Sequence, residues 1–156
     1  MTIRPVRNED AAGLIDLIDR CFREYPGVVV EPDGIDSDLN AYATALEKIG
    51  GEGFVIEQRG GIVGMASGYL TPGGTYQLKR LYLDASLRGG GMGNKLLQLI
   101  EERAKACGAG SLELWSDSRF VRAHRFYQRE GFTRSGRQRE LGDLSNSLEY
   151  HFVKKC

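Results

Sequence analysis

Hydrophobic residues in the first fifty positions recur at helical spacing. After a short strand at residues 2–4, an apolar stripe predicts one helix, for which Asn8 is the expected N-cap. The stripe consists of Ala11, Leu14, Ile15, Ile18, Cys21 and Phe22. Residues 25–38 contain two prolines and two glycines, which is typical of a loop. Leu39, Tyr42, Leu46 and Ile49 then mark a second helix, which Gly50 and Gly51 end.

The middle of the chain has the pattern of β-strands. Two runs rich in β-branched and aromatic residues, 54–58 and 62–70, flank a glycine pair and predict a hairpin. A further strand at 75–83 follows the turn at 72–74. Regular alternation places Tyr76, Leu78, Arg80 and Tyr82 on one face of it, with Gln77, Lys79, Leu81 and Leu83 on the other.

The last third alternates between helix and strand. A helix follows residue 91, and its apolar stripe is Leu96, Leu97, Ile100, Ala104 and Cys107. A strand at 111–115, a helix at 121–130, a strand or hairpin arm at 132–141 and a strand at 147–153 complete the order. Because no repeat or linker interrupts the chain, we expect one α+β domain, residues 1–156, with a mixed sheet.

Composition narrows the function only slightly. The 156 residues are 41% hydrophobic and 27% charged, with a formal net charge of zero, which does not favour a nucleic-acid partner. No apolar window has the length of a signal peptide or a membrane span, so we expect a cytoplasmic protein with no membrane partner. Cys21, Cys107 and Cys156 lie far apart and only two histidines occur, so neither a disulfide framework nor a metal site is indicated.

Candidate ligand-binding residues lie in a glycine loop between the strand at 75–83 and the helix that follows. Gly89, Gly90, Gly91 and Gly93 leave backbone N–H groups free to approach an anion, and the helix N-terminus adds partial positive charge. The expected ligand is a phosphate or pyrophosphate. A Walker loop is excluded because Leu96 follows Lys95, and a dinucleotide fingerprint is excluded because its third glycine is missing.

Two sequence blocks together resemble the GNAT superfamily of N-acetyltransferases. The first is Arg88-Gly89-Gly90-Gly91-Met92-Gly93, an R-x-x-G-x-G arrangement between the strand end 81–83 and the helix. The second, about thirty-five residues later, is residues 123–132, which is similar to the family's A-x-x-x-Y-x-x-x-G-F helix and strand. One departure is Phe120, because the family often has asparagine three residues before the helix alanine.

The resemblance implies a central mixed, mostly antiparallel sheet of six to seven strands with about four helices. It implies acetyl-CoA as acyl donor, an amine acceptor, no metal, and homodimers as a common assembly. The implied coenzyme-binding residues are Leu81, Tyr82, Leu83, Arg88, Gly89, Gly90, Gly91, Met92, Gly93 and Asn94. In the family, this strand splays from its neighbour after a bulge, and its free backbone groups pair with the pantetheine arm of the coenzyme. An amide near Leu81 would polarise the thioester carbonyl, and Tyr127 would protonate the departing thiolate.

The general base and the acceptor stay open at this level. Glu149 and His151 on the last strand are the side chains considered for the base, with Glu149 preferred and a water-mediated route as the alternative. The arginines at 119–139 could meet a phosphate of the coenzyme or an acidic acceptor, and residues 143–147 could line the acceptor end. The alternative function is a non-catalytic module that binds acyl-CoA as a sensor.

Overall fold

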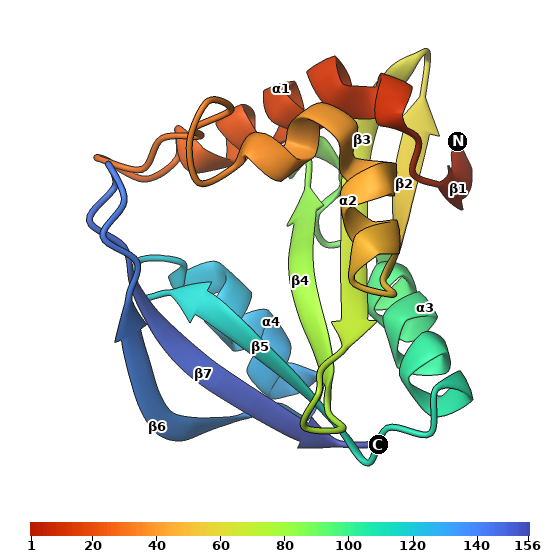
Figure 1. Ribbon diagram of the computed structural model, residues 1–156. Coiled ribbons are helices and arrows are strands. Elements are labelled where there is room, and N and C mark those ends of the chain that lie inside the picture. The colour runs from red at the N-terminus through yellow and green to blue at the C-terminus, as the bar shows by residue number, and fades with distance from the viewer.

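The computed structural model describes residues 1–156, which form one seven-stranded sheet and four α-helices (Figure 1). The strands are β1 (Thr2–Pro5), β2 (Glu52–Gln58), β3 (Gly61–Leu70), β4 (Tyr76–Leu83), β5 (Ser111–Asp117), β6 (Thr133–Glu140) and β7 (Leu148–Lys155). Their order across the sheet is β1-β2-β3-β4-β5-β7-β6, and only β4 and β5 pair in parallel. The predicted mixed, mostly antiparallel α+β fold is confirmed.

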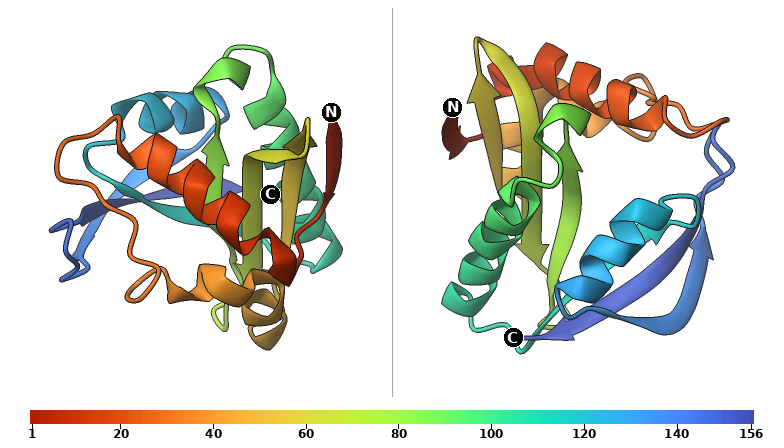
Figure 2. Two further views of the ribbon diagram at one scale, coloured as in Figure 1. Left: turned by 90° about the horizontal axis from the view of Figure 1, so that it is seen from above. Right: turned by 180° about the vertical axis from the view of Figure 1, so that it is seen from behind.

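The helices cover both faces of the sheet. They are α1 (Ala11–Phe22), α2 (Tyr42–Lys48), α3 (Met92–Ala106) and α4 (Val121–Arg129). Seen from above, α1 and α2 lie on one side of the sheet, and α3 and α4 lie on the other (Figure 2). Each side buries its own apolar cluster, so neighbouring residues of β2 such as Val55 and Ile56 belong to opposite clusters.

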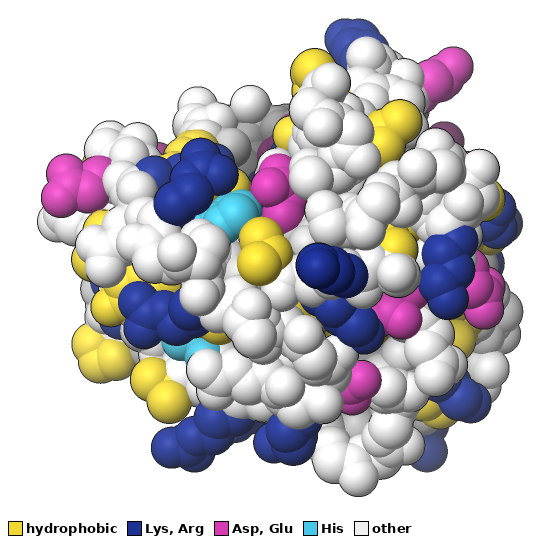
Figure 3. Space-filling model, turned by 90° about the horizontal axis from the view of Figure 1, so that it is seen from below, with side chains coloured by type: hydrophobic (Ala, Val, Ile, Leu, Met, Phe, Trp, Pro, Cys, Tyr) yellow, Lys and Arg dark blue, Asp and Glu magenta, His cyan; other side chains and the backbone are white.

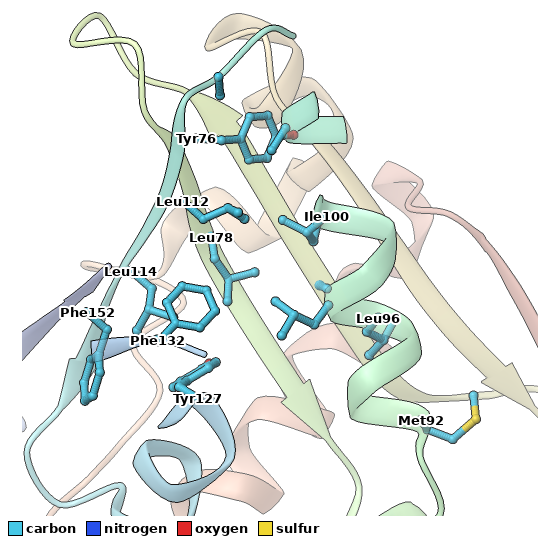
Figure 4. Packing of buried hydrophobic residues seen from close by; sticks show 14 of the residues in the cluster. Tyr76, Leu78, Met92, Leu96, Ile100, Leu112, Leu114, Tyr127, Phe132 and Phe152 are labelled. Atoms are coloured by element: carbon cyan, nitrogen blue, oxygen red, sulfur yellow. The ribbon is translucent and has the colours of Figure 1, made fainter. Parts of the chain in front are cut away.

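The cluster under α3 and α4 contains several aromatic residues. Figure 4 shows Leu96 and Ile100 of α3 facing Leu78 of β4, with Tyr127 of α4 close to Phe132. The ring centroids of Tyr127 and Phe132 are 5.7 Å apart and meet edge to face. The α4 helix is therefore held against the sheet by the same side chain that the sequence marks as reactive.

A β-bulge at Lys79 changes the faces of β4, because the register against β3 shifts by one residue there. Before the bulge, Tyr76 and Leu78 pack in the cluster under α3. After it, Tyr82 packs on the α1 side, and Arg80 lies against a tyrosine ring of that side. The prediction that these four side chains share one face is wrong, because regular alternation does not survive an inserted residue.

The same strand separates from β5 beyond the bulge. The parallel pairing of β4 with β5 covers only three positions, Tyr76 to Leu78 opposite Leu112 to Leu114. From Lys79 to Leu83, β4 pairs with β3 alone, so its other edge has unpaired backbone groups. Figure 1 shows the two strands diverging towards the upper end of β4.

Three expectations about helix ends are wrong. Cys107 is exposed, because α3 ends at Ala106 and the next residue leaves the buried stripe. Ile49 is 41% exposed, since it follows the last residue of α2. Asn8 does not cap α1, which begins at Ala11 after a short 3-10 turn; its side chain instead holds Thr44 through hydrogen bonds of 2.8 and 3.0 Å.

Candidate active site

A cavity of about 660 Å³ opens where β4 and β5 diverge. It is lined by β4, β5, α4, the end of α1, the glycine loop and the turn between β6 and β7. All the site residues expected from the sequence line it, except Gly90 and Met92. Met92 is 8% exposed and packs in the cluster under α3. The structure therefore brings Tyr127, Glu149 and most of the glycine loop to one space.

The glycine loop presents a row of unused donors. The amides from Gly89 to Asn94 form no hydrogen bond within the chain, whereas the Arg88 amide donates to the Ala85 carbonyl at 3.3 Å. Gly89 and Gly91 adopt φ values of 80° and 84°, which only glycine reaches without strain. Gly91 is the N-cap of α3, so the free amides surround the positive end of the helix dipole. This arrangement fits a phosphate or pyrophosphate.

A carboxylate stands beside this anion site. Glu24, just after α1, accepts hydrogen bonds from both Nη atoms of Arg88, at 2.6 and 2.7 Å. Arg122 of α4 donates to the same carboxylate at 3.3 Å. The Arg88 guanidinium holds the pKa of Glu24 below its ordinary value. The Glu24 carboxylate therefore binds the guanidinium groups of Arg88 and Arg122, which would otherwise be available to an incoming phosphate.

Tyr127 is almost enclosed on α4, with 6% of its surface exposed. Its hydroxyl forms no hydrogen bond within the chain, and the residue lines the cavity. Burial raises the pKa of this phenol well above its ordinary value. A phenol in this setting keeps its proton at neutral pH and has it available for a group in the cavity.

The β6 and β7 side of the cavity carries a charged and aromatic group. Glu149 Oε1 accepts a hydrogen bond of 2.7 Å from Arg139 Nε, and both residues line the cavity. The Arg139 guanidinium lies 4.4 Å from the centre of the Trp115 ring. Glu149 Oε2 has no hydrogen-bond partner within the chain, which leaves it able to accept a proton or a hydrogen bond.

His151, the other side chain considered for the base, is not part of the cavity lining. It is 3% exposed, and its Nδ1 lies 2.7 Å from Ser135 Oγ while its Nε2 lies 3.1 Å from Glu113 Oε2. These contacts join β6, β7 and β5 across the strands. Alternation along β7 puts Glu149 and His151 on one face, but it does not show which of them borders open space.

Two loops meet over the cavity at its β6 and β7 side. The Val29 amide donates to Ser145 Oγ at 2.9 Å, and the Leu144 amide donates to Glu31 Oε2 at 3.2 Å. These bonds join the segment after α1 to the turn between β6 and β7, and Figure 2 shows the two loop tips side by side in both views. The expectation that the turn borders the cavity agrees with its lining, which includes Asp143, Ser145 and Ser147.

Phe120 extends an aromatic wall along this segment. Its ring centroid lies 4.8 Å from that of Tyr25 and 5.9 Å from that of Phe22. Phe22 and Tyr25 belong to the end of α1 and the following loop, whereas Phe120 precedes α4. The aromatic ring at this position thus joins the two halves of the sheet across the cavity, a contact that the sequence alone did not indicate.

Charges elsewhere on the molecule are mixed. On the face shown in Figure 3, Lys and Arg side chains are spread over the surface with Asp and Glu between several of them. No three His, Cys, Asp or Glu side chains come together as a metal site would require. No helix is both long and apolar enough to cross a bilayer.

The sheet order, the splayed central strands and the cavity between them define the architecture that the sequence resemblance implied. The acetyltransferase (GNAT) family matches residues 12–132. The chain therefore belongs to this family of acetyltransferases.

Individual relatives agree with this assignment. An IAA acetyltransferase of Azospirillum brasilense is 32% identical over 85 residues, which are 53% of this chain and 56% of that protein. The chain thus matches little more than half the length of that relative. An acetyltransferase structure from Streptococcus agalactiae has a TM-score of 0.85 at 20% identity and covers 99% of this chain and 98% of its own. The yncA structure from Salmonella typhimurium, a putative acetyltransferase with acetyl-CoA, has a TM-score of 0.72 at 21% identity, covering 99% and 93%.

Proposed function

We propose that this protein transfers the acetyl group of acetyl-CoA directly to a primary amine. The observation that carries the proposal is that two stretches of the chain have no backbone hydrogen-bond partner: the amides of residues 89–94 and the edge of β4 from Lys79 to Leu83. The first suits a pyrophosphate and the second suits the amide-bearing arm of coenzyme A, which can pair with it like a strand. A cavity of about 660 Å³ connects the two.

The residues around the cavity supply the steps of a direct transfer. The amine nitrogen forms a bond to the acetyl carbonyl carbon, and the bond from that carbon to sulfur breaks. Negative charge develops on the carbonyl oxygen, and we assign its stabilisation to a backbone amide of the free β4 edge near Leu81. Tyr127, protonated and without a partner, gives its proton to the leaving thiolate. The nitrogen, which is positively charged once the new bond has formed, gives up its second proton, and this proton restores the Tyr127 phenol.

An ammonium acceptor must also lose a proton before it attacks. We assign this step to Glu149, acting directly or through a water, because its Oε2 is free and the residue lines the cavity. Gln77 of the central strand lines the cavity as well, but a neutral amide does not act as a base. No cysteine other than Cys21 lines the cavity, and it lies against Arg88 and the backbone of β4, so no covalent acetyl-enzyme is proposed.

The test is a calorimetric titration with acetyl-CoA, with ATP and NAD as control ligands. We expect micromolar binding of acetyl-CoA alone, followed by release of free thiol when an amine acceptor is added. Binding without thiol release for any amine would favour the sensor function, which needs the loop but not Tyr127. Absence of acetyl-CoA binding by the folded protein would refute both.

A further inference from the structure

Arg139 presents an unoccupied guanidinium fork to the cavity. Its Nε donates a hydrogen bond of 2.7 Å to Glu149, and its Cζ lies 4.4 Å from the centre of the Trp115 ring. Neither Nη atom has a hydrogen-bond partner within the chain, and the side chain is 42% exposed at the cavity lining. A guanidinium held in this way matches the two oxygens of a carboxylate or a phosphate.

The charges around this fork leave a surplus of positive charge. Glu149 balances Arg139, but Arg137 lies against the same Trp115 ring, 5.2 Å from its centre, and forms no ion pair within the chain. Two arginines therefore lie against one indole, and only Arg139 forms an ion pair. An anion near Arg139 would be stabilised by both cations at once.

Two joined loops border this side of the cavity. The bonds from Val29 to Ser145 and from Leu144 to Glu31 tie the two loops together over this side of the cavity. We take these joined loops, of which Val29 and Ser145 line the cavity, to favour a small acceptor over a polypeptide lying across the site. Between the loops, Tyr25, Val28 and Phe120 offer apolar surface to the body of such a molecule.

We propose that the acceptor is a small amine that also carries an oxyanion, a carboxylate or a phosphate, and that the Arg139 fork binds this group. The inference rests on the proposed function and names the substrate class of the same cavity. The amine nitrogen points towards the free edge of β4, and the oxyanion lies on the β6 and β7 side. Arg139 thereby determines specificity as well as contacting Glu149.

Trp115 provides a test that does not depend on catalysis, because it is the only tryptophan in the chain and contacts Arg139. The probes are the standard L-amino acids and the ω-amino acids from β-alanine to 6-aminohexanoate. Each acid is compared with its carboxamide, in which an uncharged group replaces the carboxylate. O-Phosphoethanolamine is compared with ethanolamine to test whether a phosphate binds in the same place. Fluorescence titrations without acetyl-CoA measure binding, and thiol release with acetyl-CoA measures KM and kcat for the same pairs.

We expect at least one acid to bind, and to be acetylated with a KM lower than that of its carboxamide, by about tenfold to a hundredfold. Arg139→Gln should remove this preference, and Arg139→Lys should restore it only in part because lysine lacks the fork. Arg137→Gln is the matched control: it removes a cation from the same ring but no donor from the cavity lining, so it should weaken the binding of acids only modestly and the preference should persist. Tighter binding of O-phosphoethanolamine than of every carboxylate would assign the oxyanion as phosphate.

The proposal is overturned if acids and carboxamides bind and react equally. It is also overturned if Arg139→Gln lowers kcat for both members of a pair equally, which would mean that Arg139 acts only through Glu149. Loss of acetyl-CoA binding in calorimetry would refute the proposed function instead, while the fluorescence titration would still decide whether Arg139 binds an oxyanion.

Discussion

At the residue scale, the sequence indicated candidate side chains but not their surroundings. Tyr127 was found from its place in a motif, and the structure adds that its hydroxyl borders the cavity without a partner. Glu24 could not be found, because it lies far from the glycine loop in sequence and meets Arg88 only through the packing of α1. Contacts between distant segments leave no local pattern that periodicity could detect.

Tyr127→Phe tests the general acid. The change keeps the ring contacts with Phe126 and Phe132 and removes no hydrogen bond within the chain, so the melting temperature should stay unchanged. We expect kcat to fall by about a hundredfold or more, as for other general acids, while the Kd for acetyl-CoA changes little. Steady-state kinetics and calorimetry measure the two effects. Wild-type kcat in the variant would exclude the role.

Glu24→Gln tests whether this carboxylate competes with the coenzyme. Removing its charge frees Arg88 and Arg122 for the pyrophosphate, so the Kd for acetyl-CoA should decrease several-fold, most clearly at low ionic strength. Glu47→Gln, at an exposed position without an ion pair, is the control for net charge. Weaker binding in the Glu24 variant would show instead that Glu24 positions Arg88 for the coenzyme.

At the element scale, helices and strands followed from periodicity, but the irregular points that form the site did not. Apart from Cys107, the apolar stripe on α3 was predicted correctly, because the helix buries one face; the hairpin of β2 and β3 was also predicted correctly, from two β-prone runs around a glycine pair. Alternation did not reveal the bulge at Lys79, since a single inserted residue has no signature in a run of otherwise β-prone residues; only the family resemblance implied a bulge in this strand. That bulge accompanies the separation of β4 from β5, on which the cavity depends.

Gly91→Ala tests the glycine loop as an element, with Gly60→Ala as its matched control. Both glycines have positive φ, 84° and 78°, and an added Cβ would meet nothing within 4 Å at either place. Each substitution should therefore cost a similar free energy of unfolding, about 1–2 kcal/mol. Only Gly91→Ala should weaken acetyl-CoA binding, by about tenfold or more, because it alone turns amides away from the ligand. Equal affinity in both variants, measured by calorimetry, would contradict the loop assignment.

At the scale of the whole molecule, the order of elements and the two blocks of sequence were sufficient to predict the fold class and family. They could not predict the acceptor side, because it is built from loops 23–36 and 141–147, which are joined by single hydrogen bonds rather than by a repeating pattern. The sequence showed the arginines at 119–139, but it could not show that Arg139 pairs with Glu149 while Arg137 forms no ion pair, because pairing depends on the fold.

Buried tyrosines give the whole molecule a predicted alkaline limit. Burial raises the pKa of Tyr42 and Tyr76 to about 12, and it raises the pKa of Tyr82 and Tyr127 as well. In the unfolded chain these phenols ionise near pH 10, so above that pH the native state binds more protons than the unfolded state. These four phenols should therefore leave the free energy of unfolding unchanged below about pH 10. As the pH rises from there towards 12, their ionisation in the unfolded chain should lower the free energy of unfolding.

Urea denaturation at pH 8 and pH 11, with tyrosinate absorbance recorded in the same samples, measures this loss. Tyr76→Phe should be less sensitive to the increase in pH than the wild type, because its phenol forms no hydrogen bond within the chain and its removal takes away one of the four ionisations. Full stability at pH 11 would mean that the unfolded and folded chains ionise alike, which burial of these rings does not permit. The same rings pack the core that positions β4 and α4, so the alkaline loss of stability should coincide with loss of acetyl-CoA binding.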